Sequence, residues 1–426
     1  MGLTEAATAQ GLAARLGAVE LVRAVLDEGA MLDEGRLPGA VAKASPPERA
    51  QARALADLTL RRRGQIDDLL RGFVPKAPRT PVNHILRVMA AELLFARTAA
   101  HAAVDTAVRT AKQLKAGKMA GLINAVGRRI TREGAEVISG QDAAALAMPD
   151  WLWDRLEADW GLEATRAIAE AHLIPPPQDL AYRDPAYPLP DGAERLPCGT
   201  VRLRERAQIT ALPGFAEGAF WAQDAAAHLP AQMIPEPRGK RVLDLCAAPG
   251  GKTMQLAAMG ADVTALDISA RRLERLGENL ARTGLAAQII TADALSWQPE
   301  AAFDAILLDA PCSATGTIRR HPDLPHRLRA GDLAPLIALQ TALIDRAFGW
   351  LAPKGSLIFC TCSLFKAEGE EQVAGFLDRQ SNARLVPVVL PGLDPLFSVG
   401  VLRSRPDHWA GLGHLDGFYA ARIDRS

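Results

Sequence analysis

Apolar residues recur every three or four positions through the first third of the chain. The spacing is clear in residues 18–26 and 85–94. This period is typical of amphipathic helices that bury one face. Turn-forming residues interrupt it at residues 45–47, at 75–81 and near Gly117. The pattern therefore predicts an all-helical bundle of about five to seven helices between Gly11 and about Arg132.

Two further regions precede a change of pattern. Residues 149–172 carry widely spaced Trp and Leu residues and predict more helices, which end at the proline run 175–177. Between Leu180 and Pro230, short strand-like pieces alternate with turn residues. We expect a small α+β extension there that packs on the part of the chain that follows.

After Pro235 the chain repeats a strand, a turn and a helix. Strands are predicted at residues 241–246, 262–267, 287–293, 304–309 and 355–361. Strands that alternate with helices favour a parallel, doubly wound sheet, and near-continuous apolar runs indicate strands buried on both faces. Ligands of such sheets bind at the carboxyl ends of the strands. We expect a multidomain protein divided into residues 1–140, 141–234 and 235–426.

Composition narrows the class of protein. Hydrophobic residues make up 49% of the chain and charged residues 23%, and no tract of 18 apolar residues occurs. We expect no membrane span and no signal peptide. The five cysteines are an odd number, and they lack the clustered partners of a zinc site. The sequence thus predicts a cytoplasmic protein without a bound metal, and we expect a monomer.

Charge is distributed unevenly along the chain, although the formal net charge is zero. Residues 53–132 contain 16 Lys and Arg against 5 Asp and Glu. Such an excess is typical of a surface that binds a polyanion such as RNA, while solvated helix faces are the alternative. The residues concerned include Arg61, Arg62, Arg63, Lys112, Lys115, Lys118, Arg128, Arg129 and Arg132.

A glycine-rich turn follows the first strand of the last region. The turn, here named the glycine-rich loop, comprises Cys246, Ala247, Ala248, Pro249, Gly250, Gly251 and Lys252. Such a loop lets backbone amides approach a polar ligand closely. A Walker A loop would need glycine at position 246, and the dinucleotide spacing G-x-G-x-x-G is absent. A nucleoside-type ligand is the remaining interpretation.

Two acidic residues at strand ends agree with that ligand. Asp267 ends the second strand, where a carboxylate could accept hydrogen bonds from ribose hydroxyls. Asp293 ends the third, where it could accept one from an adenine amine. Either residue alone could instead be a helix cap.

Two thiols follow two further strands of the same sheet. Cys312 comes after the strand that ends at Asp309, and Cys362 closes the next strand. Both lie beyond strand ends near Asp309 and Lys252, where an activated thiolate is plausible. Cys246 and Cys360 fit ordinary packing equally well.

The motifs resemble those of the Sun-type, or RsmB-like, bacterial ribosomal RNA cytosine-5 methyltransferases. The similar segments are residues 243–253, 309–316, 361–363, 213–215 with 223–224, and 319–323, and residues 85–130 are similar to the NusB-like RNA-binding domain of these enzymes. The family's usual glycine is replaced by Ala314. The resemblance implies an all-α NusB-like domain followed by an α/β class I, Rossmann-like methyltransferase domain.

The resemblance also implies a reaction and roles for residues. It implies methyl transfer from S-adenosylmethionine to carbon 5 of a cytosine in 16S ribosomal RNA, the RNA of the small ribosomal subunit. Cys362 would be the nucleophile and Cys312 would assist product release, while Asp309 would hold the base and Lys252 would support the same site electrostatically. Arg319, Arg320 and His321 are expected to contact RNA.

Two other functions stay open at this point. A DNA cytosine methyltransferase would use the Pro-Cys cysteine, Cys312, as its nucleophile. A non-catalytic RNA-binding or antitermination factor could carry a decayed methyltransferase domain. The intact acidic residues and the two thiols argue against decay.

Overall fold

The computed structural model describes residues 2–32 and 39–426, and the chain forms two compact units. One unit contains the residues up to Ile174 together with Ile318–Leu328. The other contains Pro175–Thr317 and Arg329–Ser426. The domain boundaries expected after residues 140 and 234 stay a prediction, because a compact unit need not coincide with a domain.

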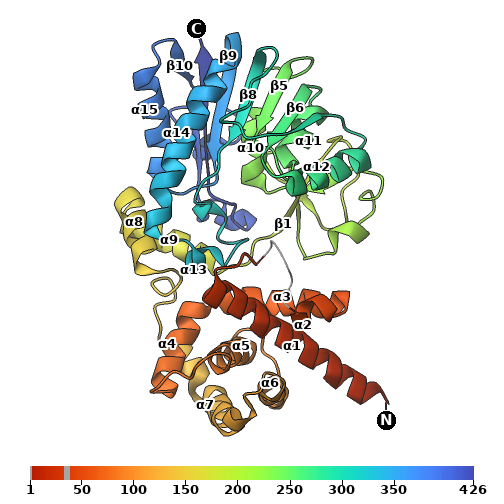
Figure 1. Ribbon diagram of the computed structural model, residues 1–426, viewed down its shortest axis with the longest axis vertical. Helices are drawn as coiled ribbons and strands as arrows, with labels where there is room; N and C mark the ends of the chain where they lie inside the picture. The colour runs from red at the N-terminus through yellow and green to blue at the C-terminus, as the bar shows by residue number, and fades with distance from the viewer. Residues whose placement is uncertain (1, 33–38) are drawn as a thin grey trace. The chain divides into compact units, whose positions relative to one another are not determined.

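The first unit is helical, as the periodicity predicts (Figure 1). Its α-helices are α1 (Gly2–Glu28), α2 (Gly39–Lys43), α3 (Pro46–Arg61), α4 (Arg63–Phe73), α5 (Val82–Leu94), α6 (Ala100–Gln113), α7 (Ala120–Ser139), α8 (Asp150–Trp160), α9 (Leu162–His172) and α13 (Leu324–Arg327). Each predicted break lies between two of these helices. At the first break, the backbone and hydroxyl of Ser45 both donate to the Glu48 carboxylate, which stabilises the start of α3.

The apolar faces of these helices form one core. Val22, Leu60, Ile66, Met89 and Ile123 are among its fully buried members. Helices with one apolar stripe gain most of their stability by burying that stripe against neighbours. The spacing of apolar residues thus determines both which segments form helices and which side chains form their shared core.

Residues 318–328 pack in the helical unit although they are distant from it in sequence. Arg61 is buried in α3, and its guanidinium donates to the carbonyl oxygens of His172 (2.9 Å) and Arg319 (2.7 Å). The His326 ring lies 2.9 Å from the carbonyl oxygen of Leu60. Arg319 is only 1% exposed. The expected contact of Arg319 with RNA is therefore wrong, because this side chain is buried in the helical unit.

A small sheet begins the second unit and agrees with the strand-like pieces of the middle region. Its strand order is β2-β3-β1-β4, with all neighbours antiparallel. The strands are β1 (Gln178–Tyr182), β2 (Glu194–Arg195), β3 (Val201–Leu203) and β4 (Phe220–Ala222). Helix α10 (Ala225–Gln232) follows, and the Asp224 side chain caps its first turn by accepting from the Ala226 amide.

The large sheet has nine strands in the order β11-β12-β13-β9-β8-β5-β6-β7, with β10 paired to β13. Its strands are β5 (Arg241–Leu245), β6 (Asp262–Asp267), β7 (Gln288–Thr291), β8 (Phe303–Asp309), β9 (Leu351–Thr361), β10 (Ala383–Val386), β11 (Phe397–Ser398), β12 (Val401–Ser404) and β13 (Phe418–Arg425). The helices between them are α11 (Gly251–Ala258), α12 (Ala270–Thr283), α14 (Leu333–Gly349) and α15 (Glu370–Arg379).

Helices cover both faces of this sheet, which explains its continuous apolar runs. Val242 of β5 belongs to a core that includes Leu229 of α10. Its neighbour Leu243 belongs to a second core with Ile344 of α14 and Phe376 of α15. Successive side chains of a strand point to opposite faces, so a strand between two helical layers needs apolar side chains on both faces.

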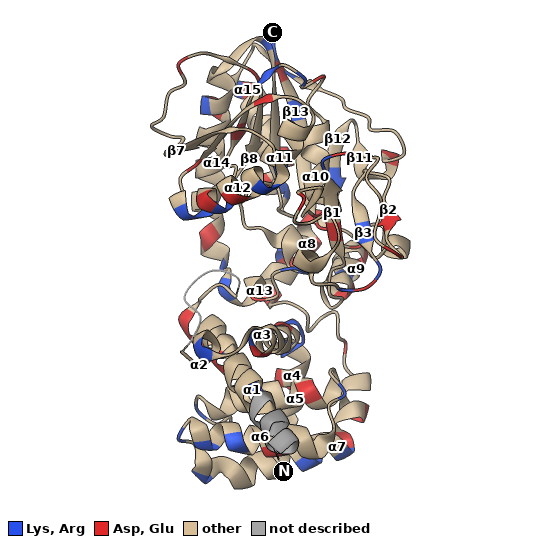
Figure 2. Cartoon of the chain, turned by 90° about the vertical axis from the view of Figure 1, so that its right-hand side faces the viewer, with Lys and Arg blue, Asp and Glu red and all other residues tan. Residues whose placement is uncertain are grey.

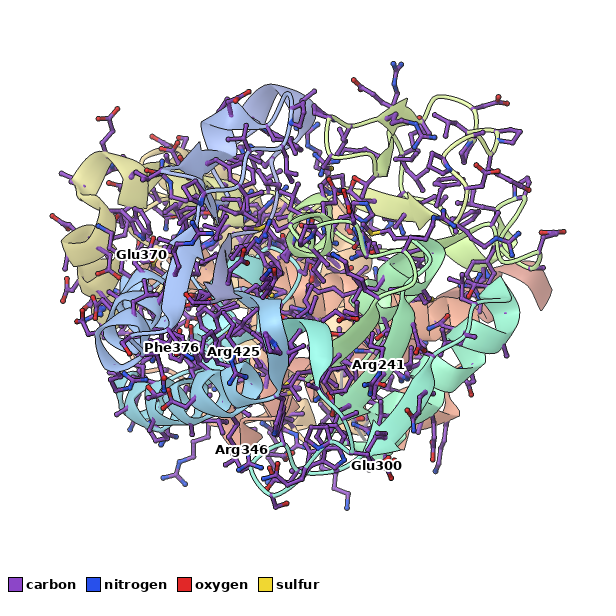
Figure 3. All side chains as sticks on the ribbon, turned by 90° about the horizontal axis from the view of Figure 1, so that it is seen from above. Arg241, Glu300, Arg346, Glu370, Phe376 and Arg425 are labelled. Atoms are coloured by element: carbon purple, nitrogen blue, oxygen red, sulfur yellow. The ribbon has the colours of Figure 1, made fainter. Side chains whose placement is uncertain are left out.

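The five predicted strands are β5 to β9, and they pair in parallel as expected. The sheet is nevertheless mixed, because β13 pairs antiparallel with β9, and β10 and β12 pair antiparallel with β13. Figure 3 labels Arg241, where β5 begins, and Arg425, where the antiparallel β13 ends. The expectation of a wholly parallel sheet is corrected at this edge.

Candidate active site

The register of the parallel strands brings the predicted residues to one edge of the sheet. Leu245 pairs with Leu266 of β6 and Leu308 of β8. Asp309 pairs in turn with Cys360 of β9. The strand ends therefore lie side by side. Asp267 and Asp309 are the last residues of two of these strands, and the glycine-rich loop and Cys362 come directly after two others.

The glycine-rich loop needs glycine at one position for two reasons. Gly250 has a φ of 104°, which side chains strongly disfavour. A Cβ atom at this position would also lie 2.2 Å from Cδ1 of Leu276 in α12. The close approach of α12 and the left-handed turn thus both require glycine before α11 begins.

Asp244 is a site residue that sequence analysis missed. It lies inside β5, is 1% exposed, and accepts a hydrogen bond of 2.5 Å from the Thr253 hydroxyl through one carboxylate oxygen. Its other oxygen has no hydrogen-bond partner among the described residues. Burial raises the pKa of Asp244 to about 7, although the hydrogen bond from Thr253 lowers it. The sequence did carry a signal for this residue, because a carboxylate stands inside an otherwise apolar predicted strand.

A cavity of about 330 Å³ adjoins this edge of the sheet, within the size range of small-molecule sites. Both the large sheet and the small extension contribute to its walls. Its lining consists of Ile209, Phe215, Trp221, Ala222, Gln223, Asp224, Ala227, Asp244, Ala247, Ala248, Pro249, Gly251, Lys252, Met254, Asn279, Arg282 and Asp309. Asn279 and Arg282 of α12 lay outside the predicted set, because nothing in the α12 pattern marks them.

Lys252 and Asp309 form an ion pair at the cavity, with 2.8 Å between the ammonium and the carboxylate. Burial alone would lower the pKa of Lys252, but the charge and hydrogen bond of Asp309, together with the nearby Cys360 and Asp244, outweigh burial and raise the pKa. The ammonium also lies 5.1 Å from the centre of the Phe418 ring. Lys252 is therefore a fixed positive charge beside the reactive edge.

Two thiols meet at the same edge. The Sγ atoms of Cys312 and Cys362 are 3.5 Å apart, a hydrogen-bond distance that leaves both cysteines free. The hydrogen bond with Cys362 and burial raise the pKa of Cys312 well above its usual value. This side chain is thus held as a neutral thiol. The structure brings together the two cysteines that the sequence singled out.

The other cysteines at this edge are less suited to react. Cys360 is fully buried, and burial together with the charge of Asp309 raises its pKa. Burial also raises the pKa of Cys246, which has a φ of 65° in the glycine-rich loop. The burial of Cys246 and Cys360 agrees with a packing role, which the sequence allowed for both.

Asp267 lies beside the loop, but its carboxylate already has partners. It accepts from the amides of Ala248 (3.1 Å) and Ser269 (2.8 Å), and it pairs with the Arg272 guanidinium at 3.1 Å. Hydrogen bonds to ribose would have to compete with Arg272, whose side chain is 41% exposed. The role of Asp267 in ligand binding stays a prediction.

Asp293 differs from the other predicted site residues. It is exposed, does not line the cavity, and accepts a hydrogen bond of 2.9 Å from the Leu295 amide. This bond to the amide two residues on closes a turn, and no helix begins there, so Asp293 is not the helix cap that the sequence allowed as an alternative. Its contact with an adenine stays a prediction.

The basic residues of the helical unit lie in different surroundings. Arg61 is buried, and Arg63 pairs with Asp67 at 3.2 Å, so these residues stabilise the fold. One group of exposed basic residues lies on and between α6 and α7, whose charged positions are coloured in Figure 2. It consists of Lys112, Lys115, Lys118, Arg128 and Arg132. These five residues are named the α6–α7 basic patch.

Among the described residues, no helix has both the length and the apolar character needed to cross a lipid bilayer. The expected monomeric state, the absence of a metal and the cytoplasmic location stay predictions.

Known proteins resemble the chain along almost its whole length. Residues 231–424 match the family model described as 16S rRNA methyltransferase RsmB/F, and residues 12–132 match that of the NusB family. Ribosomal RNA small subunit methyltransferase B from Xanthomonas campestris pv. campestris is 35% identical, covering 97% of this chain and 98% of the relative. The protein of the same name from Pseudomonas putida is 37% identical over 96% and 98% of the two chains.

A solved structure agrees in fold. The methyltransferase homolog protein from Pyrococcus horikoshii has a TM-score of 0.56 and 26% identity. It covers 67% of this chain and 98% of its own length.

Proposed function

The chain belongs to the family of ribosomal RNA small subunit methyltransferase B, and from this premise we propose that it methylates carbon 5 of a cytosine in 16S ribosomal RNA. S-adenosylmethionine is the cofactor of this methyltransferase family. The observation that carries the cytosine-5 assignment is the pair of free thiols, 3.5 Å apart, beside the ion pair of Lys252 and Asp309.

Carbon 5 of cytosine is a poor nucleophile until a group adds at carbon 6 and turns the ring into an enamine. The Cys362 thiolate forms the bond to carbon 6, and carbon 5 then takes the methyl group. A base such as water next takes the proton at carbon 5, and the electron pair of that carbon–hydrogen bond re-forms the ring double bond and expels the Cys362 thiolate as the carbon–sulfur bond breaks. Cys312 lies in contact with Cys362 and assists this release.

Two charged residues complete the base site. Asp309 holds the amine edge and ring nitrogen of the cytosine. Lys252 offsets the negative charge of Asp309 and stabilises charge that develops on the ring. A fixed charge in a largely buried site costs little reorganisation during reaction, so this pair favours the transition state.

The cavity residues fit the cofactor. When bound, S-adenosylmethionine supplies a methyl group on a positively charged sulfur. The unpaired oxygen of Asp244 and the glycine-rich loop offer an acceptor and a close backbone approach for such a cation. Asp267, with Asp293 farther along the sheet, would complete the nucleoside end.

The target cytosine must leave its stack to reach the two thiols, as bases do in other enzymes that modify them. Single-stranded or locally unpaired RNA is therefore the expected substrate. The α6–α7 basic patch supplies affinity for the phosphate backbone.

The test compares two cysteine variants on small-subunit ribosomal RNA. Cys362→Ala should abolish methyl transfer, because no adduct can form. Cys312→Ala should accumulate a covalent complex between protein and RNA, visible as a slowly migrating band on a denaturing gel. If Cys362→Ala traps the RNA instead, Cys312 is the nucleophile and Cys362 assists release, as expected for the mechanism of a DNA cytosine methyltransferase.

The non-catalytic alternative is tested separately. A decayed methyltransferase domain would not bind S-adenosylmethionine, so calorimetric titration of the wild-type protein should detect binding if the proposal holds. Absence of binding would favour an RNA-binding factor.

A further inference from the structure

One buried carboxylate contacts the residues that follow both reactive cysteines. Ser313 follows Cys312, and Ser363 follows Cys362. The two serine hydroxyls lie 2.5 Å and 2.6 Å from the same oxygen of Glu368. Glu368 is 0% exposed.

The other oxygen of Glu368 also has two donors. It accepts from the Ser313 amide (2.9 Å) and from the side-chain amide of Gln340 (2.9 Å). Gln340 donates in addition to the carbonyl oxygen of Pro311, the residue before Cys312. The loop of Cys312 is thus held on both sides of the thiol.

Four donors on one carboxylate suit an ionised acid, which can only accept hydrogen bonds. Such charge-assisted bonds in a buried site are stronger than neutral ones. The same loops are also joined directly, because the Gly316 amide donates to the carbonyl oxygen of Cys362 at 2.9 Å. The arrangement constrains both loops at once.

We propose that Glu368 is a positioning residue that sets the separation and orientation of the Cys312 and Cys362 thiols. The inference rests on the proposed roles of these cysteines. Glu368 acts through Ser313 and Ser363 and does not itself contact the base. The reaction needs one thiol at carbon 6 and the other nearby for release, so a small displacement of either loop slows a step.

The charge of Glu368 has a second effect on Cys312. Among the described residues, the titratable groups that act on this thiol are Cys362 and Glu368, and both favour its neutral form, while a hydrogen bond with the backbone of Ala314 favours the thiolate. After the hydrogen bond with Cys362 and burial, the negative charge of Glu368 raises the pKa of Cys312 further. A neutral substitute for Glu368 should therefore let Cys312 ionise at lower pH.

The first experiment uses the full-length protein with Glu368→Gln and Glu368→Ala. The control is Glu371→Gln, because Glu371 is exposed in the first turn of α15, three residues farther along the chain. We expect kcat for methyl transfer to fall by about ten- to a hundredfold, more for Ala than for Gln, with S-adenosylmethionine affinity equal to the control. Unchanged kcat in both Glu368 variants would overturn the proposal.

Two serine variants separate the steps and avoid removing the buried charge. Ser363→Ala should slow formation of the RNA adduct, while Ser313→Ala should slow its release and raise the amount of adduct at steady state. Equal effects of the two variants on the same step would count against the proposal.

The last readout needs neither RNA nor cofactor. The pH dependence of Cys312 alkylation by iodoacetamide, located by mass spectrometry, should move to lower pH in Glu368→Gln and not in Glu371→Gln. A midpoint equal to the control would overturn the inference. If Glu368→Gln shows this shift but Cys312→Ala traps no RNA adduct, the proposed function is refuted instead.

Discussion

The ammonium of Lys252 lies 2.8 Å from the carboxylate of Asp309, and this ion pair joins the start of α11 to the end of β8. The pair connects the residues beside the cavity to those that precede the thiols. Removing the charge of Lys252 should therefore affect the reaction more than the fold, since the remaining partner, Asp309, is 31% exposed and water can solvate it.

Lys252→Met keeps a long side chain but removes the charge. We expect kcat/KM for methyl transfer to fall by about 100- to 1,000-fold, because a buried electrostatic group next to the reacting atoms is removed. Radioactive methyl incorporation into RNA measures the effect. Lys43→Met, at an exposed position in the helical unit, is the control. Equal activity of the two variants would refute a role for Lys252.

The raised pKa of Asp244 makes stability depend on pH. An unfolded Asp titrates near 3.9, whereas folded Asp244 titrates at about 7. Between these values the folded protein holds more protons than the unfolded chain, so Asp244 lowers the free energy of unfolding as pH rises from about 4 to about 7. The full difference is at most about 4 kcal/mol, at 1.36 kcal/mol per pKa unit.

Asp244→Asn should remove this contribution. Urea unfolding at pH 5 and pH 7.5 measures it, with the change in the wild type compared with the change in the variant. We expect the wild type to lose more stability than Asp244→Asn between the two pH values. Equal losses in the two proteins would show that Asp244 titrates near its ordinary pKa.

Gly250→Ala should destabilise the second unit by roughly 1–3 kcal/mol, because the new methyl group would overlap Leu276 and strain the turn. Gly251→Ala is the matched control, since its Cβ would meet Gln223 no closer than 3.5 Å. Thermal unfolding of both variants checks the difference. Equal melting temperatures would mean that α12 can move away from the loop.

The α6–α7 basic patch should account for part of the salt dependence of RNA binding. Replacing Lys112, Lys118 and Arg128 with Gln removes three exposed charges. We expect the slope of log affinity against log salt to become shallower by about 0.7 for each phosphate of a single strand that the variant no longer neutralises. The control is Lys43→Gln with Lys76→Gln, also exposed in the helical unit. The same slope in both proteins would place the RNA elsewhere.

The parts of the site that follow strand ends were predictable from sequence. Asp309 and Cys362 lie together because the register of parallel strands aligns their carboxyl ends. Asp244 was missed because it precedes a strand end, and only packing reveals that one oxygen has no partner among the described residues. Glu368 was missed for a similar reason, since its four donors come from three separate segments of the chain.

The fold shows the same limit. Helices and parallel strands have local patterns, so the helical region with its breaks was predicted, and the parallel strands were predicted with nearly correct bounds. The antiparallel strands after Thr361 were not, because β11 and β12 are short and are held by pairing with distant residues. The burial of Arg61 and Arg319 could not be predicted from local sequence patterns either. The sequence shows that both residues are charged, but not that backbone carbonyl oxygens from distant segments surround them.

Residues Ile318–Leu328 belong to the helical unit, although the residues before and after them belong to the other. The polypeptide thus crosses between the units three times, at residues 174–175, 317–318 and 328–329. If the gene were cut after codon 174, residues 318–328 would be separated from the Arg61 guanidinium and the Leu60 carbonyl oxygen, with which they form hydrogen bonds. Recombination that exchanges one half of this enzyme for another should therefore succeed only when the eleven-residue segment travels with the helices.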